Sequence, residues 1–451
     1  MKGFSLKSSF MLLCVVVLTA AGCRRDPVIV TDLDLALEEN LRSASGGQGL
    51  SHFQLPDDGD YNRLPQDPLN PITRSKVELG KILFHETALG TNPREAQGAG
   101  TYSCASCHHV GAGFQAGVIQ GIGEGGVGFG VNGEARKPNP GYVLDSIDVQ
   151  PIRTPSALNI AYQECVLWNG QFGATGINAG TQAMWTTGTP KETNHLGYQG
   201  TEIQAIAGLK VHRSDVTAAL ENVSPDYKAL FDQAFPQVPE VDRMDRERAG
   251  LAIAAYERTL VANQAPFQRW LRGDKSAMDD QEKHGAVLFF GKARCYTCHN
   301  GPALNSMEFH ALGMADLSGF GTYGVDPNHA AHLGRGGFTG KRDDEYKFKV
   351  PQLYNLKDSP FFGHGGTFTS VYNVVRYKNA AVPQNTDVPS GRLSSEFRPL
   401  QLTEQEVTDI AVFVERSLYD PGLRRYVPAS TLSGQCFPNN DALSKIDLGC
   451  N

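Results

Sequence analysis

The sequence predicts a mainly α-helical fold with long loops, divided between two domains. Its 451 residues exceed what one hydrophobic core usually serves. Apolar residues recur at helical spacing in several stretches, whereas strand patterns are short and scattered. Residues 111–155 are dense in glycine and proline, which is typical of a loop built around another group.

The first 23 residues are predicted to form an export signal. Lysines precede an apolar run from Phe10 to Leu18, which is too short to span a bilayer with margin, and small residues lead to Cys23. Residues 20–23 resemble a lipoprotein processing box, although Ala20 stands where Leu is usual, so lipidation of Cys23 and plain secretion both stay open. Both outcomes predict a bacterial periplasmic protein. Its only attachment to a membrane would be the lipid anchor, if Cys23 is lipidated.

Residues 24–63 are polar and show no sustained period, which predicts a flexible tether with one short helix near residues 33–41. A second helix is expected after a Thr73 or Ser75 cap, leading toward the first cysteine pair, from its apolar residues Val77, Leu79, Leu83 and Phe84.

The glycine-dense loop contains a formal match to the dinucleotide fingerprint at residues 121–126. That fingerprint needs a strand before it and a helix after it, and glycines and prolines flank this one on both sides. We therefore do not expect nucleotide binding. The net charge of -7 also argues against a nucleic-acid partner and fits a soluble redox partner better.

Two longer helices are predicted in the second half of the chain. One begins near Asp245 with acidic residues in its first turn, runs to about residue 271 and links the two domains. The other begins at the capping box of residues 403–406 and continues to Leu418.

Two Cys-x-x-Cys-His motifs carry the strongest chemical signal: Cys104, Cys107 and His108, and Cys295, Cys298 and His299. Each motif places two thiols one turn apart and an imidazole directly after them, which is the arrangement for covalent haem c attachment with a proximal histidine. A zinc ribbon or a disulfide is the alternative. The motifs predict an N-terminal haem c domain in residues 64–272 and a C-terminal haem c domain in residues 273–451.

The remaining cysteines have other predicted roles. Cys436 and Cys450 bracket a short polar tail of the C-terminal domain and are expected to bridge each other, which would staple the C-terminus. Cys165 stands beside Val166 and Leu167, so a buried inert thiol is the favoured interpretation and a nucleophile is the alternative.

The chain resembles the bacterial dihaem cytochrome c peroxidases and their relatives of the MauG type over roughly residues 64–420. The matching stretches follow the family's order: NPITRSKVELGKILFHETALG, CASCHHVGAGF, RTPSALN with LWNG, AAYERTL, GAVLFFGKARCYTCHNGPAL, FKVPQLYNLKDSPFFGHGGTFTSVYNVVRY and LTEQEVTDIAVFVERSL. The resemblance implies that the N-terminal haem meets hydrogen peroxide and that the C-terminal haem takes up electrons. It also implies that Trp168 relays charge between the haems.

The resemblance further implies groups that move a proton during peroxide cleavage. Gln204 matches the family's glutamine, and the family's glutamate falls close to His212, so His212 is the candidate acid-base group, with Glu202 in reserve. The distal histidine of the peroxidases has no counterpart, since no histidine follows His109 until His195. The first haem is therefore expected to be open, or capped by a more distant group such as His212.

The second haem is expected to be six-coordinate. The far ligand, a Met or a Tyr in the family, falls on Tyr377, with Lys378 and Met314 behind it, and a surface tyrosine stays open as an alternative. His364 is expected near this haem, bonding a propionate. The family's calcium ion is a further expectation, although Arg153 and Thr154 stand where an Asn ligand belongs; carbonyls near Ser359 and Pro360 would contribute.

These implications leave three functions open. The first is a peroxidase that takes electrons from a small c-type cytochrome or a cupredoxin. The second is a MauG-like enzyme that oxidatively modifies a residue of a partner protein. The third is a non-catalytic electron-transfer cytochrome.

Overall fold

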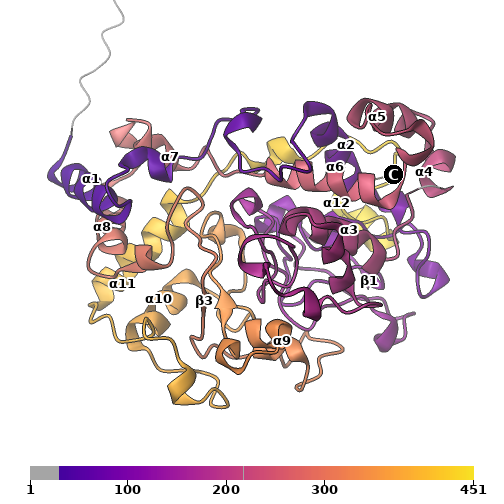
Figure 1. Cartoon of the computed structure of the whole chain (residues 1–451). Helices are drawn as coiled ribbons and strands as arrows, with labels where there is room; N and C mark the ends of the chain where they lie inside the picture. The colour runs from indigo at the N-terminus through magenta and orange to yellow at the C-terminus, as the bar shows by residue number, and fades with distance from the viewer. Residues whose placement is uncertain (1–29, 217, 451) are drawn as a thin grey trace, which may run out of the picture.

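The computed structural model describes residues 30–216 and 218–450 and confirms a mainly helical chain (Figure 1). Its α-helices are α1 (Asp32–Ala44), α2 (Arg74–His85), α3 (Gly200–Val211), α4 (Ala218–Val223), α5 (Asp226–Ala234), α6 (Arg246–Arg258), α7 (Pro266–Leu271), α8 (Asp280–Phe290), α9 (Arg335–Thr339), α10 (Val371–Ala380), α11 (Glu404–Val412) and α12 (Ala442–Leu448). Short antiparallel ribbons pair β1 (Gly126–Val127) with β2 (Lys137–Pro138) and β3 (Phe309–His310) with β4 (Phe348–Lys349). None of the helices in this described part is long and apolar enough to cross a bilayer. The export signal and Cys23 lie outside the described residues.

The predicted helices are present with their expected caps. Thr73 caps α2, Asp245 caps α6, and Thr403 forms a capping box with Glu406 at the start of α11. The helix expected to run unbroken to residue 271 instead ends at Arg258, and α7 starts again with a proline in its first turn.

A close helix crossing is repeated in two modules, which we define as residues 74–262 and 280–420. In the first module, a Cβ on Gly80 of α2 would lie 1.9 Å from the carbonyl oxygen of Ala252 in α6. In the second module, a Cβ on Gly285 of α8 would lie 2.0 Å from the carbonyl oxygen of Asp409 in α11. Only glycine allows backbones to approach so closely, so both crossings depend on it.

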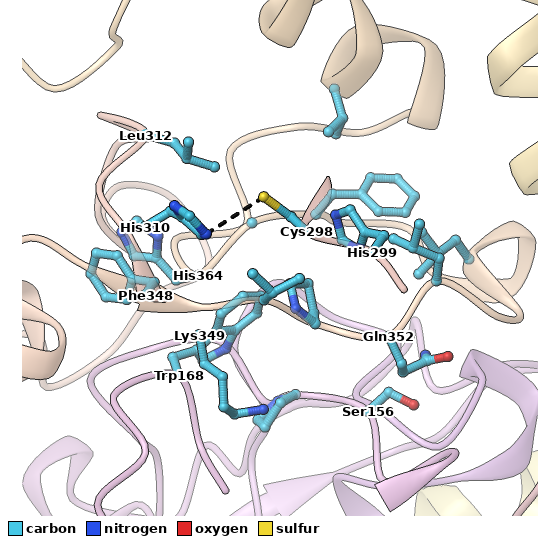
Figure 2. Close-up of a pocket in the computed structure, with 18 of the residues that line it drawn as sticks. Ser156, Trp168, Cys298, His299, His310, Leu312, Phe348, Lys349, Gln352 and His364 are labelled. Carbon is cyan, nitrogen blue, oxygen red and sulfur yellow. Dashed lines mark hydrogen bonds between the residues drawn. The ribbon is translucent and has the colours of Figure 1, made fainter. Parts of the chain in front are cut away.

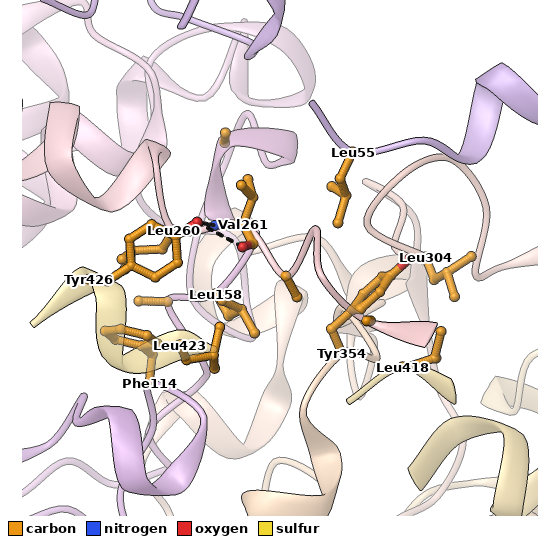
Figure 3. Close-up of a cluster of buried hydrophobic side chains, with 14 of the residues drawn as sticks. Leu55, Phe114, Leu158, Leu260, Val261, Leu304, Tyr354, Leu418, Leu423 and Tyr426 are labelled. Carbon is orange, nitrogen blue, oxygen red and sulfur yellow. Dashed lines mark hydrogen bonds between the residues drawn. The ribbon is translucent and has the colours of Figure 1, made fainter. Parts of the chain in front are cut away.

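A loop between the two helices of each crossing pair repeats as well. Asn159 and Asn355 both adopt the left-handed conformation, with φ of 56° and 54°. The Asn159 amide donates to the carbonyl of Leu260 at 2.6 Å, and the Asn355 amide donates to that of Leu418 at 3.0 Å. The two modules are thus built on one plan, and the buried cluster in Figure 3 joins them, with Leu158 and Leu260 from the first and Tyr354 and Leu418 from the second.

The prediction of a flexible tether is wrong for residues 30–63. Helix α1 packs on α8 of the second module, with Leu37 and Leu41 fully buried. Asp34 is also buried, accepts from the Trp270 indole at 2.7 Å and pairs with Lys283 at 2.9 Å. The polar composition concealed this docking because only one stripe of the helix is apolar.

The C-terminal tail carries the predicted Cys436–Cys450 disulfide. The tail was expected to belong to the C-terminal domain, but it contacts the first module. Asp441, which caps α12, pairs with the buried guanidinium of Arg136 at 3.1 Å. Asp447 accepts from the backbone amides of residues 129 and 130. Helix α1 therefore packs on the second module, although it precedes the first in sequence. The C-terminal tail packs on the first module, although it follows the second.

Candidate functional site

One cavity is lined by residues of both modules. His108 contributes from the first module, and Cys295, Cys298 and His299 contribute from the second. Figure 2 shows part of this cavity. The wall between the motifs is mostly apolar and includes Ile160, Val166, Leu167, Leu312, Val350, Val374 and Val375. Such a wall suits a large flat apolar cofactor.

The four motif cysteines are free thiols, although the tail cysteines of the same chain are bridged. Each pair lies on one short 3₁₀ turn, at Cys104–Ser106 and Cys295–Thr297. Burial raises the pKa of the Cys104, Cys107 and Cys295 thiols to about 12. A zinc ribbon would need both pairs as thiolates around one ion, and here the pairs belong to different modules.

The two motif histidines are prepared to bind a metal through Nε2. His108 Nδ1 lies 3.2 Å from the carbonyl oxygen of Phe114, and His299 Nδ1 lies 3.0 Å from that of Leu304. Burial lowers the pKa of both imidazoles to about 4, so both are neutral at pH 7. With Nδ1–H donating to a carbonyl, the Nε2 lone pair is left for iron, and the residues present therefore fit two haem groups.

The residues expected between the two centres do lie in the cavity wall. Trp168 and His364 both line it, and their rings meet edge to face with centroids 6.3 Å apart (Figure 2). The Trp168 indole donates to the carbonyl of Arg153 at 2.8 Å. His364 stacks on Phe348, and its Nε2 lies 3.1 Å from an Asp316 carboxylate oxygen. These partners fix both rings in orientation.

Helix α3 brings Gln204 and His212 together along one stripe. Gly208 stands between them at helical spacing, and a Cβ on it would lie 3.6 Å from Gln204 Nε2 and 4.0 Å from His212 Cδ2. Gln204 lines the cavity, whereas His212, the C-cap residue of α3, is not among the lining residues. His212 Nδ1 lies 2.6 Å from Asp148 Oδ2. Burial works to lower the pKa of His212, but the Asp148 carboxylate outweighs it and the net shift is upward.

Glu202 does not reach the cavity, so the structure does not support its reserve role. Its carboxylate is fully buried in an ion pair with Arg258, at 2.6 Å, and also accepts from Asn70. Family position did not predict another acid, Glu257, although it lies in the matching stretch AAYERTL. Glu257 lines the cavity, one of its carboxylate oxygens has no partner in the described residues, and burial raises its pKa to about 8.

Tyr377, predicted as the ligand of the second iron, is not among the residues that line the cavity. Its hydroxyl donates to the carbonyl of Leu312 at 2.6 Å, and its ring packs between Phe368 and Phe397. The residues behind it in the prediction, Lys378 and Met314, both line the cavity instead.

The expected calcium ion does not fit this chain. The buried Arg153 guanidinium donates to five neutral oxygens, from the carbonyls of Ala116, Val118 and Ile119, the Gln115 amide and the Ser359 hydroxyl. A calcium site needs six to eight oxygens, usually with carboxylates among them, and this cluster has none and already holds a cation.

The other sequence signals are structural. A Cβ on Gly121, in the apparent dinucleotide fingerprint, would lie 2.6 Å from Thr154 Oγ1 and 3.0 Å from Cys107 Sγ, so the glycine lets the loop close over the first motif. Cys165 is fully buried and burial raises its thiol pKa, in agreement with an inert thiol.

The histidines of both Cys-x-x-Cys-His motifs line one cavity, which is an arrangement typical of two-haem cytochromes. The family model described as di-haem cytochrome c peroxidase matches residues 74–276. The methylamine utilization protein MauG of Methylorubrum extorquens is 29% identical over 79% of this chain and 82% of its own length. Cytochrome-c peroxidase IdrP1 of Denitromonas iodatirespirans is 28% identical over 85% of this chain and 91% of its own.

The chain is thus similar in sequence to the dihaem cytochrome c peroxidases and to the MauG proteins. A solved structure of a MauG-like protein associated with microbial copper homeostasis shares the fold, with a TM-score of 0.55 and 23% identity. That match covers 84% of this chain and 98% of the other.

Proposed function

We propose that this chain is a periplasmic dihaem peroxidase that reduces hydrogen peroxide to water. The observation that carries the proposal is a single cavity with two unlike histidine centres. His108 shares its module with Gln204 and His212, whereas His299 belongs to the module of α10, and Trp168 also lines the cavity. Cys104 and Cys107 would hold one haem through thioethers, and Cys295 and Cys298 the other.

When bound, the haems supply redox-active iron and store oxidising equivalents. The chain's own residues handle protons and orientation. His212, held by Asp148, takes a proton from one peroxide oxygen and returns it to the other, while the Gln204 carboxamide orients the substrate. Reduction of one peroxide consumes two electrons and two protons and releases two waters. The electrons come from a small c-type cytochrome or a cupredoxin.

The test is steady-state turnover of protein purified from cells that mature cytochromes c. We expect two haems that stay attached after acid-acetone extraction, and peroxide-dependent oxidation of a reduced small cytochrome. A C104A/C107A variant should keep one haem and lose turnover, whereas a C165A variant should keep both. Loss of all colour to acid-acetone, or intact haems without turnover, would contradict the proposal.

A MauG-like activity on a partner protein is the second candidate. It is favoured by Lys378 of α10, a basic side chain that lines the cavity together with His299. An amine is a stronger donor to iron than a thioether and would stabilise oxidised iron. If peroxide produces a long-lived state in which the protein stores two oxidising equivalents, and turnover with a reduced cytochrome is poor, the MauG-like activity is favoured. A protein that leaves peroxide unreacted would instead be an electron carrier.

The proposed location includes a lipid anchor at Cys23. Fractionation tests it directly: the natural chain should sediment with membranes, and C23A should be retained uncleaved or released. Soluble natural chain would favour plain secretion.

A further inference from the structure

One face of helix α10 lines the cavity. Val371, Val374, Val375 and Lys378 all line it, at the spacing of one helix face. Tyr377 is one residue away and therefore about 100° round the helix, where it packs in the apolar core. The face that meets the second centre thus ends in a lysine.

Among the residues that the structure describes, the only favourable interactions of the Lys378 amine are electrostatic ones with two motif thiols. It lies close enough to the Cys295 and Cys298 thiols to interact with them electrostatically, and burial lowers its pKa to about 8. A buried ammonium without a partner is costly, whereas a neutral amine offers a lone pair. The side chain is therefore suited to a ligand that lies within the cavity.

We infer that Lys378 is the distal ligand of the second haem iron, on the face opposite His299. On binding, the ammonium releases one proton to solvent and the nitrogen lone pair enters the iron coordination sphere, with no change of oxidation state. This inference rests on the proposed function only in that a haem is bound at His299.

Two other roles fit the geometry less well. A propionate partner should lie away from Cys295 and Cys298, because the thioether bonds and the propionates occupy opposite edges of haem c. Met314 also lines the cavity, but its sulfur lies against the loop that carries His364, since a Cβ on Gly363 would be 3.2 Å from Met314 Sδ. The face of α10 that lines the cavity therefore favours the lysine.

The test is electron paramagnetic resonance of the oxidised two-haem protein, independent of turnover. In K378Q, whose side chain stays polar but is one bond shorter and has no basic nitrogen, the low-spin signal of one haem should be lost, and K378M should restore a low-spin signal of thioether type. The matched controls Y377F and M314L should leave the natural signal unchanged. A low-spin signal that survives in K378Q, or that is lost in either control, overturns the inference.

A second measurement needs no variant. Protein grown with nitrogen-15 lysine should show one strongly coupled labelled nitrogen at a low-spin iron in pulsed spectra. Absence of that coupling overturns the inference even if K378Q fails to fold. Protein without covalent haem would instead contradict the proposed function, so the two failures are distinguishable.

Discussion

Trp168 and His364 occupy equivalent positions in the two modules, and their rings meet at an interplanar angle of 68°. Each lies nine residues after the left-handed asparagine of its module, Asn159 or Asn355. The backbones are bonded reciprocally: the Lys349 amide donates to the carbonyl of Trp168 at 2.8 Å, and the amide of residue 153 donates to that of His364 at 2.9 Å. These contacts from both modules hold the Trp168 indole in its position in the cavity wall.

Replacing Trp168 by phenylalanine should slow peroxide turnover while both haems stay attached. The variant keeps an aromatic ring but loses the indole and its bond to the carbonyl of residue 153. We expect a loss of about tenfold or more, equivalent to about 1.4 kcal/mol of barrier, measured with a reduced cytochrome donor. W185F is the control, because Trp185 is buried in the same module without lining the cavity. Equal rates in both variants would remove the relay role.

Weakening the His212–Asp148 pair should change both the rate and its pH dependence. Removing the imidazole in H212A should cut peroxide consumption by on the order of a hundredfold or more. Because Asp148 is what raises the His212 pKa, D148N should move that titration to lower pH in the rate profile. H195Q, at an exposed histidine, is the control. An unshifted profile in D148N would show that the dyad does not handle the proton.

Much of this arrangement was predictable because the helix caps and the two Cys-x-x-Cys-His motifs are local signals. Family spacing could not separate Tyr377 from Lys378. The helical period relative to Val371 and Val374 does separate them, since only Lys378 lies on the face that lines the cavity. The sequence did not predict that α1 packs on the second module and the tail on the first. Both contacts depend on residues far apart in the chain, such as Asp441 with Arg136.

The activity should not depend on calcium. Arg153 already places a cation among the oxygens of residues 115–119 and Ser359, so elemental analysis should find no stoichiometric calcium, and a chelator should leave the spectra and the melting temperature unchanged. R153Q should lower the free energy of unfolding by about 2 kcal/mol or more, because buried carbonyls lose their donor. R153K, which keeps the charge, should lose less. One bound calcium per chain in the natural protein would contradict this view of the site.

The stability of the protein should fall as pH rises toward 8, because of Glu257. Burial raises the pKa of its carboxyl from 4.5 to about 8 in the folded chain. Between these values the unfolded chain has released the proton that the folded chain still holds, so the stabilisation is complete below about pH 4.5 and is lost as pH approaches 8.

E257Q keeps the neutral amide form at every pH and should remove that slope. The difference in the free energy of unfolding between pH 5 and pH 8 should shrink by on the order of 3 kcal/mol relative to the natural chain. Denaturant unfolding at both pH values measures it, with E39Q, at an exposed carboxylate, as the control. If E257Q keeps the full slope, Glu257 is ionised in the folded protein, and the cavity wall must then contain a cation or solvent that compensates the charge.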